Sequence, residues 1–214
     1  MIKISVTSIS SRGAGEEIDV TFLAENSEGN SEKNTFTLSS RQYLALGITK
    51  GETDTEIFDA AAYAAQVWAA TKRGVVLLGY GAVSPRAMKA KLVSKGFDKT
   101  VAEDSAKELV AMGLMNPAAD ASELARKCVT KLWGKKRITS ELYEKGYSSE
   151  AVANALNFLD DMGVDFAFNC SKLIEKRYGE LPADPMERKK LFAALCRYGY
   201  STTEIKQAME LYKM

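Results

Sequence analysis

Leu92-Val93-Ser94-Lys95-Gly96-Phe97-Asp98 is the stretch that decides the fold, because the chain repeats its pattern twice more. It returns as Leu142-Tyr143-Glu144-Lys145-Gly146-Tyr147-Ser148 and as Leu195-Cys196-Arg197-Tyr198-Gly199-Tyr200-Ser201. In each copy a helical run ends at a glycine, which suits the left-handed position after a helix end. An aromatic residue and a helix-capping residue follow, so each copy predicts a corner between two helices.

The residues around the corner repeat as well. An offset of 50 residues carries six residues of the first copy onto identical residues, namely Leu142, Lys145, Gly146, Leu159, Met162 and Gly163. A further offset of 53 carries Leu142, Gly146, Tyr147 and Ser148 onto identical residues of a third copy. Longer helical patterns lie between the corners, so the sequence predicts three tandem three-helix units. Such units contact mainly their neighbours, and we expect an elongated array.

The N-terminal part has a different pattern. Residues 2–7, 17–22 and 35–38 alternate apolar and polar side chains, which predicts two or three short antiparallel strands. Ser39 or Ser40 would cap a short helix that ends at Gly47. From Thr53 the pattern becomes helical, with a break expected near residues 79–83.

The predicted fold is therefore mainly α, with three helix-turn-helix-like repeats after a small β segment. We divide the chain into a β segment (1–50), a helical connector (51–83) and three repeats (84–116, 117–165 and 166–214).

Composition excludes several classes of protein. The chain of 214 residues is 46% hydrophobic and 27% charged, as in globular proteins. No apolar run is long enough to cross a bilayer, and the first residues lack the pattern of a signal peptide. We expect a cytoplasmic monomer with no membrane partner.

The residue types also argue against an enzyme. Histidine is absent, which excludes Ser-His-Asp and Cys-His catalysis and His-ligated zinc. The three cysteines lie far apart and form no CxxC pair. Adjacent carboxylates point in different directions on a helix, and Gly79-Tyr80-Gly81 lacks the rest of a phosphate loop. We expect no catalysis, metal or cofactor.

Charge is unevenly distributed along the chain. Residues 1–60 hold 5 basic and 10 acidic residues, whereas residues 61–214 hold 24 basic and 18 acidic residues. The long C-terminal part is thus suited to a polyanionic partner. The candidate binding residues are basic and recur at similar places in the repeats: Lys89, Lys91, Lys95, Lys131, Lys135, Lys136, Arg137, Lys145, Arg188, Lys189, Lys190 and Arg197. The alternative is that they form ordinary solvated helix faces.

Aromatic residues lie among these cations. Tyr147 and Tyr200 are explained as apolar contacts that fix the start of the next helix. For Trp133 and Tyr198, both core packing and stacking on exposed bases stay open.

Three tandem three-helix units with an LxxKGF/Y corner resemble the RecX family over most of the chain. The third copy carries the closest resemblance, Arg188 to Ser201, and Gly134 to Leu142 of the second is also similar. The resemblance implies a non-enzymatic protein that binds the RecA filament on DNA and modulates, mostly inhibits, its recombinase, ATPase and coprotease activities in DNA repair and the SOS response. Single-stranded or duplex DNA would be a further partner of the basic faces.

The chain departs from the family pattern at one point. Members usually carry an Asp-Asp pair after the Gly-Leu that closes the first unit, whereas here Asn116-Pro117 follows. If those acids contact the partner, this chain would bind it differently; if they cap the next helix, Asn116 can do the same. The rival hypothesis is a helix-turn-helix regulator that binds duplex DNA, but the second helices, residues 101–112 and 151–162, lack the dense Arg, Asn and Gln that are expected of base readers.

Overall fold

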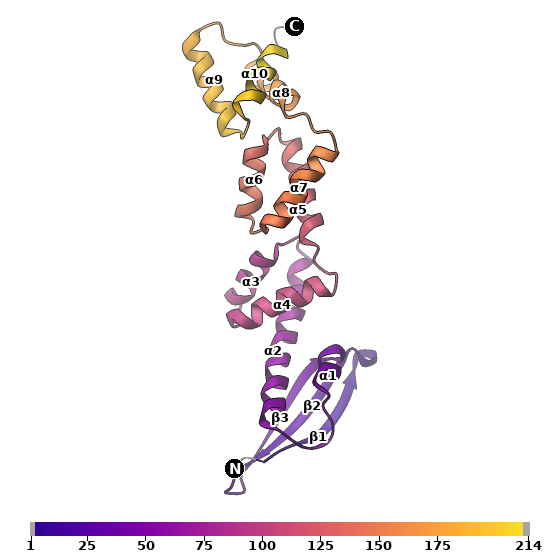
Figure 1. Ribbon diagram of the computed structural model, residues 1–214. Helices are drawn as coiled ribbons and strands as arrows, with labels where there is room; N and C mark the ends of the chain where they lie inside the picture. Colours follow the sequence, from indigo (N-terminus) through magenta and orange to yellow (C-terminus); the bar gives the residue numbers. More distant parts are fainter. Residues whose placement is uncertain (1–2, 212–214) are drawn as a thin grey trace. The chain divides into compact units, whose positions relative to one another are not determined.

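The structure is a computed structural model that describes residues 3–211 (Figure 1). Ile2, in the first predicted strand, and residues 212–214, in the third predicted repeat, lie outside the described residues. The strands are β1 (Lys3–Arg12), β2 (Glu17–Glu25), β3 (Ser31–Ser39) and β4 (Gly51–Thr53). The described helices are α1 (Ser40–Leu46), α2 (Thr55–Leu78), α3 (Pro85–Ser94), α4 (Lys99–Ala111), α5 (Pro117–Thr130), α6 (Lys135–Glu144), α7 (Ser149–Asp161), α8 (Phe166–Tyr178), α9 (Pro185–Arg197) and α10 (Thr202–Leu211).

The described residues form two compact units. The first unit lies within Met1–Gly81 and Met88–Leu114, and the second lies within Ala82–Ala87 and Met115–Met214. The predicted class, mainly α with a small N-terminal antiparallel sheet, is confirmed. The expected elongation of the array and the five segment boundaries stay predictions.

The sheet of the first unit is antiparallel, in the order β3-β2-β1-β4. Its three main strands are longer than the alternation predicts, and β4 is a fourth strand that the sequence analysis missed. With only three residues, β4 is too short to show an alternating pattern. Pairing with the edge of β1, rather than its own sequence, makes this segment a strand.

One face of the sheet packs against the first half of α2 (Figure 1). Val20, Phe22 and Leu38 are fully buried there. The ring of Phe22 lies edge-on to that of Phe58 from α2, with 5.3 Å between centroids. Three short strands hold together poorly in water, so the helix supplies the apolar surface that the sheet needs.

The second half of α2 packs against α4. Gly74 lies inside the helix, and a Cβ atom there would lie 2.6 Å from Cδ1 of Leu109. The glycine thus allows close helix contact and does not interrupt the helix, which ends at Leu78. The expected break follows it, before α3 begins at Pro85 with the Ser84 hydroxyl accepting from the amide of Ala87.

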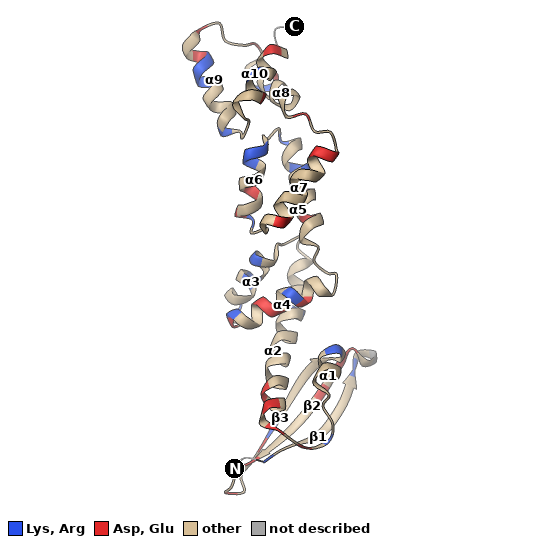
Figure 2. Ribbon diagram, viewed as in Figure 1, with Lys and Arg blue, Asp and Glu red and all other residues tan. Residues whose placement is uncertain are grey.

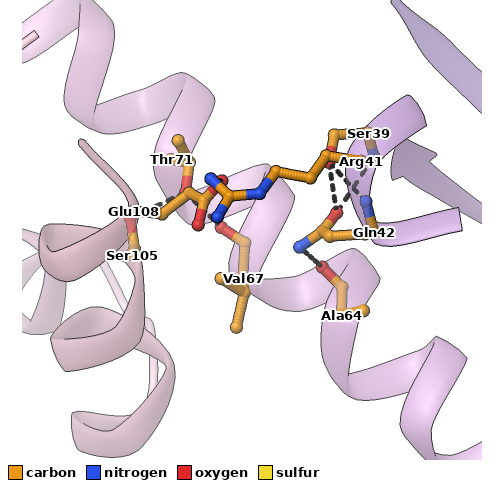
Figure 3. Close-up of polar contacts among 8 residues, drawn as sticks. All are labelled: Ser39, Arg41, Gln42, Ala64, Val67, Thr71, Ser105 and Glu108. Atoms are coloured by element: carbon orange, nitrogen blue, oxygen red, sulfur yellow. Dashed lines mark hydrogen bonds and ion pairs between the residues drawn. The ribbon is translucent and has the colours of Figure 1, made fainter. Parts of the chain in front are cut away.

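Polar contacts join the parts of the first unit (Figure 3). The hydroxyls of Thr71 on α2 and Ser105 on α4 lie 3.2 Å apart inside the helix contact. Gln42 of α1 closes a capping box with Ser39 and donates from Nε2 to the carbonyl of Ala64. The sheet, α1, α2 and α4 are therefore connected by buried packing and by hydrogen bonds.

The predicted corners are present in all three copies. Gly96, Gly146 and Gly199 have φ of 94°, 84° and 93°. In each copy the amide of the aromatic residue after the glycine donates to the carbonyl of a buried leucine five residues earlier, at Leu92, Leu142 and Leu195. Gly113 and Gly163 end α4 and α7 with the same hydrogen bond. This is the Schellman geometry.

The helix starts agree with the predictions, with one exception. The hydroxyl of Ser148 accepts from the amide of Ala151, and Ser201 forms a capping box with Glu204. Asp98 was expected to cap α4, but its side chain makes no capping hydrogen bond. Asn116 does cap α5, by accepting from the amide of Ala119, as Asp165 caps α8.

Three helix pairs repeat along the chain. α2 packs on α4, α5 packs on α7, and α8 packs on α10. The helix that the sequence analysis assigns to a connector thus occupies, relative to α4, the place that α5 and α8 occupy in their repeats.

Successive repeats meet through the corners, and the contacts within the second unit show how. The amides of Gly134 and Lys136, at the start of α6, donate to the carbonyls of Tyr198 and Gly199 at the end of α9, over 2.8 and 3.1 Å. The hydroxyl of Tyr200 donates to the carbonyl of Leu132. The corner after α6 makes a similar contact, where Ser84 donates to the carbonyl of Lys145. We call these contacts the corner joints.

The joint at Gly199 predicts a stability difference between two glycine variants. Gly199→Ala should lower the free energy of unfolding by at least about 3 kcal/mol, because a Cβ would lie 2.4 Å from the amide nitrogen of Arg137 and the left-handed backbone would also be strained. Gly163→Ala meets no atom within 4 Å and should cost only about 1–2 kcal/mol. Urea unfolding followed by circular dichroism measures both values, and equal losses would contradict the role of the joint.

Candidate interaction surface

The start of α6 carries an unusual concentration of positive charge. Lys135, Lys136 and Arg137 occupy its first turn, which holds no acidic residue, and Gly134 offers no capping side chain. Cations are unfavourable at a helix N-terminus, where the helix dipole is positive. The backbone carbonyls of the corner after α9 offset part of this unfavourable charge, because they accept hydrogen bonds from the first amides of α6. Figure 2 shows basic residues near the starts of α6 and α9, both in the second unit.

The three cations of α6 have three different environments. The ammonium group of Lys135 lies 2.9 Å from the carboxylate of Asp160 on α7. Arg137 is half-buried, with its guanidinium carbon 4.0 Å from the ring centroid of Trp133 and 5.3 Å from that of Tyr198. Lys136 is exposed and has no carboxylate within 4 Å among residues 3–211. Only Lys136 is therefore fully available to a partner.

The two aromatic residues left open by the sequence belong to the joint. Trp133 also lies beside Lys131, with 5.2 Å between the ammonium nitrogen and the ring centroid. Tyr198 lies between Arg137 and Arg177, whose guanidinium carbon is 4.8 Å from its centroid. Both aromatic residues are half-buried, so the rings pack against cations of this chain and are not free platforms for bases.

The candidate residues of the third repeat divide in the same way. Lys190 pairs with Glu187 at 2.8 Å, and Nε of Arg188 donates to the carbonyl of Pro182. Lys189 and Arg197 are exposed, and within the described part of the chain neither has a carboxylate partner.

In the remaining copies, Lys89 pairs with Glu103 at 2.5 Å and Lys145 with Glu141 at 3.6 Å. Lys91 and Lys95 are exposed and lack such a partner in the region covered by the structure. Exposed ion pairs are worth only about 0–1 kcal/mol, so the paired lysines could exchange their carboxylates for those of a partner.

A groove beside Lys95 adds two cations that the sequence analysis missed. It has a volume of about 530 Å³ and lies in the first unit between α2 and the corner after α3. Lys72 and Arg73 line it from α2, together with Phe97 from the corner. The missed residues lie more than twenty positions before Lys95, and no repeat of the corner motif points to them.

The described residues offer no cluster for a metal ion, and two of the three cysteines, Cys128 and Cys170, are buried whereas Cys196 is exposed. The described residues contain no group of three His, Cys, Asp or Glu side chains that could hold a metal ion. Burial raises the pKa of the Cys170 thiol to about 12 and also raises that of Cys128. Both thiols act as small apolar side chains of the core. No helix between residues 3 and 211 combines the length and apolar character that a bilayer crossing requires.

Comparisons with known proteins agree with the resemblance. No family model matches the chain. A regulatory protein RecX of Stenotrophomonas maltophilia is 29% identical over 126 residues, which cover 58% of this chain and 76% of that protein. A crystal structure of a regulatory protein RecX covers 97% of this chain and 99% of its own, with a TM-score of 0.68 and 20% identity. That of RecX from Lactobacillus salivarius covers 69% and 97%, with a TM-score of 0.58 and 19% identity. The similarity to RecX is thus confirmed in sequence, and the solved structures share the fold.

The environment of Arg137 predicts that it stabilises the joint. Arg137→Lys should lower the free energy of unfolding by about 1 kcal/mol. An ammonium group is not planar and cannot stack on the rings of Trp133 and Tyr198 as the guanidinium group does. Lys136→Ala, one residue away and exposed, should stay within about 0.5 kcal/mol of the parent. Urea unfolding compares the two, and an unchanged value for Arg137→Lys would remove the stack from the stabilising contacts.

Proposed function

We propose that this chain is a RecX-like regulator that binds the RecA nucleoprotein filament and mostly inhibits its recombinase, ATPase and coprotease activities. The observation that carries the proposal is the agreement of two comparisons on proteins named RecX, one by sequence over 126 residues and one by fold over 97% of the chain. In this function the chain acts without catalysis of its own, as a cytoplasmic monomer.

The repeats support a filament as the partner. A filament presents the same surface at regular intervals, and three similar units can offer similar contacts to successive copies. In the second unit, Lys136 and Lys189 lie in equivalent helices, α6 and α9, and both are exposed. Phosphates and acidic protein surfaces both bind such cations through charge-assisted hydrogen bonds.

The rival function, sequence-specific binding of duplex DNA, has less support. In a helix-turn-helix reader the second helix presents several polar side chains to base edges. Here α4 and α7 are second helices; neither contains Arg or Gln, and of the residue types that commonly read bases α7 offers only Asn154 and Asn157. One face of α7 is also buried, with Ala151, Val152, Ala155 and Leu159.

The proposed function is tested by adding the purified protein to RecA, single-stranded DNA and ATP. ATP hydrolysis should slow and filaments seen by electron microscopy should shorten as the protein approaches the RecA concentration. No effect at equal concentrations would contradict the proposal. Retention of particular duplex sequences without RecA would favour the rival.

Charge reversal identifies the surface that binds the filament. Lys136→Glu and Lys189→Glu should each raise the concentration needed for half-inhibition of ATP hydrolysis by about threefold, because each replaces an attraction by a repulsion. Lys206→Glu is the matched control, since Lys206 is exposed on α10 and outside the candidate set. The assignment fails if all three variants inhibit like the parent protein, or if Lys206→Glu loses as much as the others.

A further inference from the structure

The groove of the first unit combines an apolar lining with three cations. Ala69, Lys72, Arg73 and Val76 follow one another at steps of three, one and three residues, which places them on one face of α2. Lys95 and Phe97 line the groove from the corner after α3. Ala69, Val76 and Phe97 contribute apolar surface, so the groove has an apolar lining beside positive groups.

Two of the three cations are not neutralised. Arg73 and Lys95 are exposed and have no carboxylate within 4 Å in the described part of the chain. Lys72 lies 2.7 Å from the carboxylate of Glu17, and its hydrogen bond lowers the pKa of that group. The groove therefore has at least two positive charges available to a ligand.

The second repeat provides an internal comparison. Val67, Thr71 and Gly74 are buried on α2 with the same spacing as Ala121, Ala125 and Cys128 on α5. This correspondence places Arg126 and Lys127 of α5 at the positions of Lys72 and Arg73, and the corner repeat places Lys145 at that of Lys95. Cations thus occupy the corresponding positions in both repeats, although Lys and Arg are exchanged at two of them.

In the second repeat, however, nearby carboxylates neutralise these cations. Glu123 lies 2.8 Å from Arg126 and 3.6 Å from Lys127, and the hydrogen bond from Arg126 lowers the pKa of Glu123 to about 2. Glu141 pairs with Lys145. All three pairings join residues that lie three or four positions apart in the sequence.

The first repeat lacks both of these acids. Ala69 occupies the position of Glu123, and Lys91 occupies the position of Glu141. The aromatic residue of the corner differs as well, because Phe97 is half-buried whereas its counterpart Tyr147 is buried. Two acids of the second repeat are therefore missing beside the groove of the first repeat.

We propose that this groove binds an acidic peptide segment that carries an apolar side chain. The carboxylates of the peptide would pair with Arg73 and Lys95. Both the planar guanidinium group of Arg73 and the compact ammonium group of Lys95 suit a carboxylate. The apolar side chain would cover Ala69, Val76 and Phe97. A nucleic-acid strand fits less well, because its bases would find only the partly covered ring of Phe97 for stacking, and its polar sugar-phosphate backbone has no apolar side chain to cover Ala69 and Val76.

The inference rests on the proposed function, because the acidic peptide segment would belong to the filament protein that this chain binds. It is tested without RecA, so that its failure can be told from failure of the proposed function. The probe is a fluorescein-labelled synthetic peptide of Asp, Glu, Leu and Phe, and binding is followed by fluorescence anisotropy.

Ala69→Glu and Lys91→Glu restore, one at a time, the acids of the second repeat. Each should weaken peptide binding about tenfold, because the introduced carboxylate competes for the cations. Ala69→Glu adds ion pairs on an exposed helix face, so it should keep its circular dichroism spectrum. Ala119→Glu makes the same change at an exposed position of α5 and should bind like the parent.

Two further probes decide between the occupants. A peptide with Ser in place of Leu and Phe should bind several times more weakly, and equal binding would reduce the groove to a charged patch and overturn the proposal. Labelled oligothymidine that binds more tightly than the peptide, and loses this binding in Ala69→Glu, would assign the groove to nucleic acid instead. Equal peptide binding by Ala69→Glu and the parent would also overturn the proposal, while slowing of RecA by the parent would leave the proposed function intact.

Discussion

The left-handed glycine at the end of each short helix is the constraint on which the rest of the structure depends. Its positive φ allows the next amide to reach back to the carbonyl of a buried leucine, which fixes where the helix ends and where the chain turns. The aromatic residue that follows covers the start of the next helix. In the second unit the carbonyls of the same turn also accept hydrogen bonds from the start of α6. One short sequence thus ends a helix, directs the next one and joins two repeats.

Much of this could be predicted from the sequence, because the controlling interactions are local. The backbone conformation could be predicted at Gly96, Gly146 and Gly199, and the capping hydrogen bonds could be predicted at Ser148 and Ser201. Asp98 has a suitable residue type but makes no cap contact, since residue type alone does not fix a side-chain rotamer. β4 and the close approach at Gly74 could not be predicted, because each depends on a partner distant in the sequence.

The candidate surface was less predictable than the fold for the same reason. Lys135, Lys136 and Arg137 are alike in sequence, yet one pairs with α7, one is exposed and one lies between two rings. Those differences come from residues of other helices. Lys72 and Arg73 could not be predicted from the corner repeat, because it does not include them, although they lie beside Lys95 in the structure. A charge pattern therefore indicated the region and not the individual contacts.

The corner joint at Gly134 and Gly199 is made by main-chain atoms at a distance that excludes side chains. This close approach requires glycine at both positions, and the Tyr200 hydroxyl and the Arg137 guanidinium add side-chain contacts to it. The joint therefore constrains the residues of the turn more tightly than the exposed residues of the helices. Outward-facing side chains are then free to diverge from copy to copy. The exchange between Glu123 in one copy and Ala69 in another is a difference that this freedom permits, and it lets similar scaffolds acquire dissimilar specificities.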